Sequence, residues 1–206
     1  MLFFKQFKKL IPALGLVAAS ITAQAQDQQY ITFDPAFASQ TPNKTEVLEF
    51  FSYACNHCAS MEPLVEKLVT EIPDSAVVVP VPVAFNAAMQ PMQRLFYTLQ
   101  ALGRQDLHPK VFFAIHQEKK RLFTREVMVD WAVDQGIDKK AFEDAFDSFG
   151  VSTKVRQATE LTKQYKVEAT PSFAVAGQYL TSPGMTGTYE SSIKLVKELL
   201  GKTLKK

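Results

Sequence analysis

Cysteine and histidine are scarce in this sequence, which has two and three of them among 206 residues. The two cysteines, Cys55 and Cys58, are three positions apart, and a disulfide across so short a loop constrains the unfolded chain very little. A stabilising disulfide framework is therefore excluded. We expect no metal site, because there is no second cysteine pair and, besides His57 between the sulfurs, only His108 and His116 remain as imidazole ligands.

Blocks of like charge, internal repeats and low-complexity stretches are also absent. The chain has 23 basic and 21 acidic residues, and its formal net charge is +2. This balance gives no electrostatic reason to bind nucleic acid, so we expect no nucleic-acid partner. The length is sufficient to bury a hydrophobic core without cross-links.

The first 25 residues have the composition of a secretory signal peptide. Residues 1–9 carry three lysines and no acidic residue, an apolar run covers residues 10–19, and small residues lead to Ala23-Gln24-Ala25. A membrane-spanning helix needs roughly 20 apolar residues, about twice the length of this run. We therefore expect export and cleavage after Ala25, which leaves a chain with a net charge near −1 because the removed lysines have no acidic counterparts.

Hydrophobic periodicity in the remaining chain predicts an α/β order of elements. Pro80 and Pro82 require their strand to lie at an edge or in an irregular part of the sheet. The expected elements are strands over 30–33 and 45–53, a helix over 56–70, a strand over 76–85, several helices over 86–166, a hairpin over 172–180 and a helix over 189–200. We expect a sheet domain formed by residues 26–85 and 167–206, with an inserted helical subdomain over 86–166.

Capping residues and glycines give the helix boundaries within the inserted block. Thr124 and Asp138 are predicted N-caps. The helix after Asp138 is expected to carry Phe142, Phe146 and Phe149 on one face and to end at Gly150. Gly201 is expected to follow the end of the last helix.

The pair Cys55-Asn56-His57-Cys58 lies where a predicted strand meets a predicted helix. Free backbone N–H groups and the helix dipole at this end favour a thiolate on Cys55, and protonated His57 adds a positive charge. Cys58 lies one turn further into the helix, where burial limits it to intramolecular attack. This division of roles suits thiol–disulfide exchange. An inert structural disulfide is the alternative, and the short loop disfavours it.

Two segments, residues 49–58 and 169–173, together resemble the DsbA group of thioredoxin-fold oxidoreductases. The likeness covers essentially the whole chain after the signal peptide. It implies a thioredoxin fold with an inserted helical subdomain, and the oxidation of dithiols in unfolded, newly exported polypeptides in the bacterial periplasm. It also implies reoxidation by a quinone-linked, DsbB-type membrane partner, with no bound cofactor. Asn56 departs from the proline of the best-known members, which leaves the redox potential open.

The resemblance extends to further site residues. Thr170 and Pro171 match a cis-proline loop that faces the cysteines and binds substrate backbone, although an X–Pro bond taken alone would be expected to be trans. Glu49 matches a buried acid that accepts the proton of Cys58, and the alternative is an exposed strand residue. Glu62 also matches a family acid, and a surface glutamate remains the alternative.

Three functions remain to be compared. The leading one is a periplasmic dithiol oxidase working through Cys55 and Cys58. The second is a disulfide reductase or isomerase that uses the same site. Isomerases of this type carry a dimerisation domain, and no segment is left over to build one, which disfavours an isomerase. We also expect a monomer. The third is a non-catalytic exported chaperone or binding module with an incidental disulfide.

Overall fold

The computed structural model describes residues 28–205, so the expected signal peptide and its cleavage site lie outside the described residues. These residues form a five-stranded mixed sheet with the strand order β1-β5-β4-β2-β3. The strands are β1 (Ile31–Thr32), β2 (Thr45–Phe51), β3 (Ala76–Pro82), β4 (Ser172–Val175) and β5 (Tyr179–Thr181). β2 pairs in parallel with β3 and antiparallel with β4, so β2 lies inside the sheet and β3 at its edge. The edge position predicted from Pro80 and Pro82 is confirmed, because a strand with one neighbour tolerates missing N–H donors.

Eight α-helices accompany the sheet in the described part of the chain, and none of them is long and apolar enough to cross a membrane. The helices are α1 (Asn56–Glu71), α2 (Gln90–Ala101), α3 (His108–His116), α4 (Arg125–Asp134), α5 (Lys139–Phe146), α6 (Phe149–Gln164), α7 (Pro183–Thr186) and α8 (Tyr189–Leu204). Two short 3₁₀ turns, Ala87–Met89 and Gln105–Leu107, precede α2 and α3.

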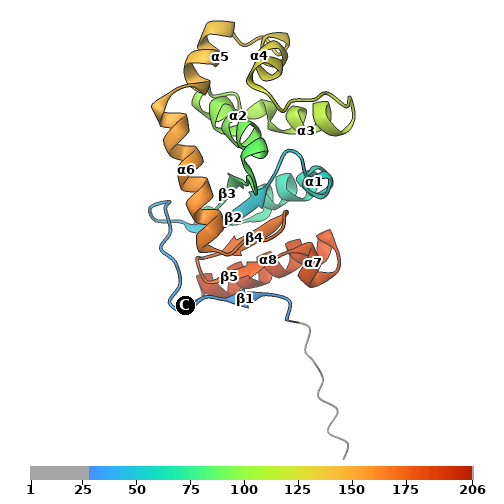
Figure 1. Cartoon of the computed structure of the whole chain (residues 1–206). Helices are drawn as coiled ribbons and strands as arrows, with labels where there is room; N and C mark the ends of the chain where they lie inside the picture. Colours follow the sequence, from blue (N-terminus) through green and yellow to red (C-terminus); the bar gives the residue numbers. More distant parts are fainter. Residues whose placement is uncertain (1–27, 206) are drawn as a thin grey trace, which may run out of the picture.

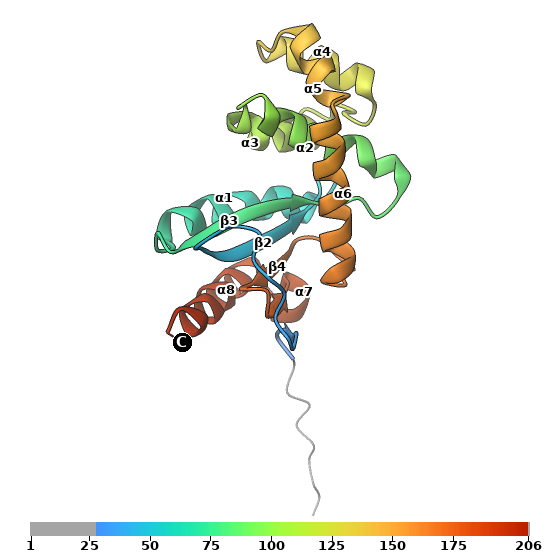
Figure 2. The ribbon, with the colours of Figure 1, turned by 90° about the vertical axis from the view of Figure 1, so that its left-hand side faces the viewer.

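The helices cover the two faces of the sheet with different parts of the chain. α1 and α8 belong to one hydrophobic cluster with Val47 and Phe173 of the sheet. A second cluster joins Phe50 on β2 to Leu95 on α2, Trp131 on α4 and Ala158 on α6. Figures 1 and 2 show α2 to α5 gathered beyond one end of the sheet, with α6 running from α5 back to the strands. This confirms the α/β fold with a helical insertion, although the insertion and the sheet share one core.

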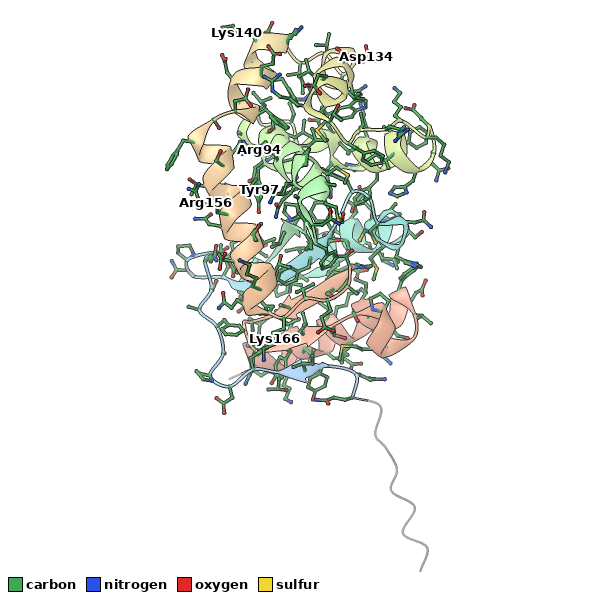
Figure 3. All side chains as sticks on the ribbon, viewed as in Figure 1. Arg94, Tyr97, Asp134, Lys140, Arg156 and Lys166 are labelled. Atoms are coloured by element: carbon green, nitrogen blue, oxygen red, sulfur yellow. The ribbon has the colours of Figure 1, made fainter. Side chains whose placement is uncertain are left out.

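α6 connects the far end of the helical block to the sheet. Figure 3 shows Lys140 and Asp134 at that far end, on α5 and α4, and Lys166 beside the strands just after α6. Arg94 on α2 donates hydrogen bonds to the carbonyl of Phe146 (2.5 Å) and to Oγ of Ser152 (3.1 Å). These bonds fix the start of α6 against α2.

One predicted helix boundary in the block is correct and another is wrong. Asp138 caps α5 as predicted, since its side chain accepts a hydrogen bond from the Ala141 N–H (2.8 Å). The same helix ends at Phe146, not at Gly150, because the side chain of Ser148 accepts from the Val151 N–H and starts α6 there. Phe149 is consequently 79% exposed and does not share a face with the phenylalanines of α5.

Glycine at position 201 was expected past the end of the last helix, but α8 continues to Leu204. Gly201 has a helical neighbour on each side, and a Cβ atom there would meet nothing within 4 Å. The glycine at position 201 therefore lies inside α8 and does not end it.

The turn between β4 and β5 depends on Gly177. Its φ is +69°, a conformation that side chains rarely adopt, and its carbonyl accepts a hydrogen bond from the Phe37 N–H (2.9 Å). A Cβ atom at this position would lie 1.9 Å from the backbone oxygen of Phe37. The N-terminal segment can therefore approach the hairpin this closely only beside a glycine.

We predict that Gly177→Ala lowers the free energy of unfolding by more than about 2 kcal/mol, because strain and a backbone clash act together. Gly201→Ala is the matched control and should raise stability by about 0.5–1 kcal/mol, the usual gain for this change inside a helix. Urea unfolding of both variants measures the difference. Equal effects of the two changes would contradict the close-approach argument.

Candidate active site

Cys55 is the N-cap residue of α1, which begins directly after the loop that follows β2. Its Sγ accepts a hydrogen bond from the backbone N–H of Cys58 (3.2 Å). An N-cap side chain normally satisfies one of the free N–H groups at a helix start, and here a sulfur takes that position. Cys58 lies within the first turn and is 1% exposed. Both cysteines are free thiols, with the first accessible and the second buried.

The surroundings shift the two thiols in opposite directions. Hydrogen bonds from the Cys58 thiol, the Thr170 side chain and the backbone N–H groups of Cys58 and His57 lower the pKa of Cys55 to about 5, although partial burial opposes this. Burial, followed by the hydrogen bond with Cys55 and its negative charge, raises the pKa of Cys58 far above the usual range of a thiol. At neutral pH the reduced pair therefore consists of a thiolate and a thiol.

The loop before β4 closes the site from the other side. The Thr170–Pro171 peptide bond is cis, as the resemblance implied. The carbonyl oxygen of Thr170 lies 3.2 Å from Sγ of Cys55 and accepts a hydrogen bond from its neutral thiol. A pocket of about 570 Å³ extends from this loop past His57 toward α7 and the start of α8. The accessible sulfur thus stands beside an open pocket.

His57 lies between the cysteines in sequence, but its exposed ring turns toward α8. Its Nδ1 atom is 2.7 Å from the hydroxyl of Tyr189. His57 helps to lower the pKa of Cys55 only through its backbone N–H, which contributes less than the Cys58 thiol, and the effect of an imidazolium charge stays a prediction. Tyr189 was not singled out in the sequence, where it appeared only as the first residue of an amphipathic helix.

Glu49 is buried, which excludes the alternative of an exposed strand residue. It is 1% exposed and alternates with Val47 along β2, and Val47 belongs to the hydrophobic cluster of α1 and α8. Glu49 therefore faces the helix that carries Cys58. Burial, together with the nearby charge of Glu62, raises the pKa of Glu49 well above its usual value.

Glu62 is also buried, at 8% exposure, so it is not a surface glutamate. Its Oε1 atom is 3.5 Å from Nε2 of His108, the first residue of α3. The sequence presented His108 only as a possible metal ligand. In the described residues, no three histidine, cysteine, aspartate or glutamate side chains are grouped so that they could hold a metal ion. The catalytic and binding roles of the site residues stay predictions.

Alkylation of the reduced protein across a pH series should show Cys55 reacting with a midpoint near pH 5, because its thiolate is stabilised. Cys58 should react slowly throughout, since it keeps its proton. Cys55→Ala is the control that isolates Cys58, and peptide mapping assigns the modified residue. Faster alkylation of Cys58, or a midpoint near the ordinary thiol value of about 8.5, would contradict this assignment.

Comparison with known proteins gives one consistent result. A family model described as a DSBA-like thioredoxin domain matches residues 46–190. The thiol:disulfide interchange protein DsbA of Bordetella parapertussis is 49% identical over 199 residues, which cover 94% of this chain and 95% of the relative. DsbA of Pseudomonas aeruginosa is 32% identical over 203 residues, covering 95% and 96% of the two chains.

Solved structures agree with the sequence relatives. A crystal structure of Pseudomonas aeruginosa DsbA superposes with a TM-score of 0.81 and 32% identity, covering 85% of this chain and 92% of that one. The oxidoreductase NmDsbA1 from N. meningitidis superposes with a TM-score of 0.75 and 26% identity, covering 86% and 93%. With this fold and a free cysteine pair at the start of α1, the chain belongs to the DsbA-like thioredoxin family of thiol:disulfide oxidoreductases.

Proposed function

We propose that the protein oxidises pairs of thiols in unfolded, newly exported polypeptides and works in the periplasm after removal of its signal peptide. In this proposal it acts as a monomer and is reoxidised by a quinone-linked, DsbB-type membrane protein. Dithiol–disulfide exchange itself is the activity of the family and of the Cys55–Cys58 pair. The direction of exchange, the compartment and the partners are the proposed part.

The opposite pKa shifts of the two cysteines are the observation that carries the proposal. A thiolate with a pKa of about 5 is a good leaving group at neutral pH. Every group that stabilises this thiolate favours the reduced form of the pair over its disulfide. The oxidised protein therefore gives its disulfide readily to a substrate dithiol, which is what an oxidase requires.

The exchange proceeds in two displacements. A substrate thiolate attacks Sγ of Cys55, the Cys55–Cys58 bond breaks, and Cys58 leaves with the electron pair and takes up a proton. The second substrate thiolate then attacks the substrate sulfur of the mixed disulfide, and Cys55 leaves as a thiolate. The substrate has lost two electrons and the protein has gained them. Reoxidation reverses these steps with the disulfide of the membrane partner.

The pocket beside Cys55 supports binding of an extended polypeptide. Thr170 and Pro171 form its wall nearest the sulfur, and Pro183 and Tyr189 line it further away. Backbone groups of Thr170 are proposed to pair with substrate backbone, which places any substrate cysteine over Cys55 regardless of the neighbouring side chains. This manner of binding suits an enzyme with many unfolded substrates.

The proposal is tested by the equilibrium potential of the pair against glutathione. Because Cys58 keeps its proton, we expect the potential to fall by about 30 mV per pH unit above pH 5 and by about 59 mV per unit below it. The value at pH 7 should lie well above that of thioredoxin, at about −270 mV.

The same assay separates the competing functions. A potential near that of thioredoxin would favour a reductase and overturn the oxidase. Incubation of the oxidised protein with a reduced, unfolded two-cysteine polypeptide should give a substrate disulfide. Cys58→Ala is the control, because it forms no disulfide of its own and should oxidise no dithiol under these conditions. A wild-type protein that also oxidises none would be a binding module.

Glu49 is proposed to take the proton of Cys58 during reoxidation, so Glu49→Gln should slow reoxidation by roughly 10²-fold near neutral pH. The variant should also be more stable than wild type at pH 8. Glu49 holds its proton in the folded protein above pH 4.5, while the unfolded chain loses it, so the stability of wild type falls as the pH rises. The stability difference should close below pH 4.

Glu46→Gln is the matched control on the same strand. Glu46 is also buried, but its Oε1 accepts hydrogen bonds from the Gln40 N–H (3.1 Å) and the Thr41 hydroxyl (2.6 Å). Its replacement should lower stability and leave reoxidation unchanged. Chemical unfolding and stopped-flow reoxidation measure both quantities. Unaltered reoxidation in Glu49→Gln would refute the proton-acceptor role.

A further inference from the structure

Beneath α1 lies an acid pair that is incompletely hydrogen-bonded. Glu49 Oε1 and Glu62 Oε2 are both buried, and neither has a hydrogen-bond partner among the described residues. Buried carboxylate oxygens are normally paired, since an unpaired one costs free energy. Burial and, second, the charge of Glu62 raise the pKa of Glu49, so the two carboxylates interact electrostatically. Such a pair holds and exchanges a proton as a unit.

His108 is the positively ionisable group in contact with this acid pair. Its Nε2 atom lies 3.5 Å from Glu62 Oε1, and its Nδ1 atom lies 2.7 Å from the hydroxyl of Tyr53. The ring also packs edge-on against Phe51 and Phe96, with centroid distances of 4.9 and 5.4 Å. Two polar contacts and these aromatic neighbours fix the ring orientation, so Nε2 remains directed at the carboxylate.

The two acids differ in their access to solvent. Glu49 is 1% exposed, whereas Glu62 is 8% exposed and lines a pocket of about 210 Å³ between α1 and α3. Glu62 is therefore the acid of the pair with access to the solvent-connected pocket. The titratable groups around this path are Glu49 on β2, Tyr53 after it, Cys58, Glu62 and Glu66 on α1, and His108 and His116 on α3.

We propose that His108 is a positioning residue that holds Glu62 as the proton-exchange partner of Glu49, so that the proton released by Cys58 leaves into the pocket between α1 and α3. This inference rests on the proposed function of the cysteine pair. In this arrangement the helical insertion takes part in the chemistry. Its helix α3 supplies His108, while α1 supplies both the sulfur of Cys58 and the carboxylate of Glu62.

The proposed proton path accounts for every proton and electron that moves during reoxidation. Cys55 is first joined to a sulfur of the oxidant. The S–H bond of Cys58 then breaks, its proton passes to the Glu49 carboxylate, and its sulfur attacks Sγ of Cys55. The oxidant sulfur leaves with the electron pair and takes a proton from water. Glu49 passes its proton to Glu62, which releases it to solvent, and Glu49 is a carboxylate again for the next cycle.

A positive charge at position 108, beside Glu62, favours ionisation of the nearby Glu49, so its removal should make Glu49 hold its proton to higher pH. We therefore expect His108→Gln to move the pH–rate profile of disulfide closure upward by about one pH unit, a tenfold slowing on the acidic limb. His108→Lys keeps a positive charge at every pH and should move the profile in the opposite direction. A purely structural role would shift both variants the same way.

The measurement follows closure of the Cys55–Cys58 disulfide from the glutathione mixed disulfide by quenched flow between pH 5 and 9. His116→Gln is the matched control: His116 lies on the same helix and its Nε2 is hydrogen-bonded to the Tyr53 carbonyl (2.8 Å), so it contacts Tyr53 without the pairing to Glu62. Its profile should match that of wild type. The midpoint of Cys55 alkylation should stay near pH 5 in all variants, because His108 makes no contact with that sulfur.

Identical closure profiles for wild type and His108→Gln would overturn the inference, as would an equal shift in His116→Gln. Glu62→Gln provides a second test if changes at His108 disturb α3. It removes the exchange partner and should slow closure at every pH, and an unaltered rate would also overturn the inference. Failure of the proposed function is distinguishable, since it would appear as a potential near that of thioredoxin, whereas closure of the disulfide and its dependence on His108 would persist.

Discussion

A difference in solvation between two sulfurs on one helical turn is the constraint on which the rest of the site depends. Cys55 caps α1 and stands beside an open pocket, while Cys58 is enclosed by the core. The sheet produces this difference, because β2 ends just before the helix and directs the chain from the interior to the surface. The loop at Thr170 then completes the surroundings of the exposed sulfur from the opposite side. Reactivity here follows from burial and hydrogen bonding, with no bound group needed to explain it.

The parts predicted correctly from the sequence depended on local signals. The junction of strand and helix at Cys55, the cap at Asp138 and the edge position of β3 each follow from residues within a few positions of one another. The buried acid at Glu49 followed from the family resemblance. Short-range sequence patterns are sufficient where the determining contact is itself short-range.

The parts that were missed depend on contacts between distant segments. Tyr189 meets His57 across 132 positions, and the buried Glu62 meets His108, which lies on α3. Nothing in the sequence of α1 indicates that neighbour. Phe149 was misplaced for a different reason: the phenylalanine spacing suited one continuous helix, but the capping side chain of Ser148 starts a new one. Periodicity alone cannot separate two consecutive helices whose apolar residues happen to stay in register.

The shared core of the sheet and the helical insertion affects how the molecule can move. Phe50 on β2 belongs to the same cluster as Leu95 on α2 and Trp131 on α4, so separating the insertion from the sheet would expose apolar surface on both sides. Hinge motion at this boundary is therefore opposed by the cost of hydrating that surface. Amide hydrogens of α4 and of β2 should exchange through the same cooperative opening. Such a molecule offers a stiff template, and the substrate makes the conformational adjustment when the two meet.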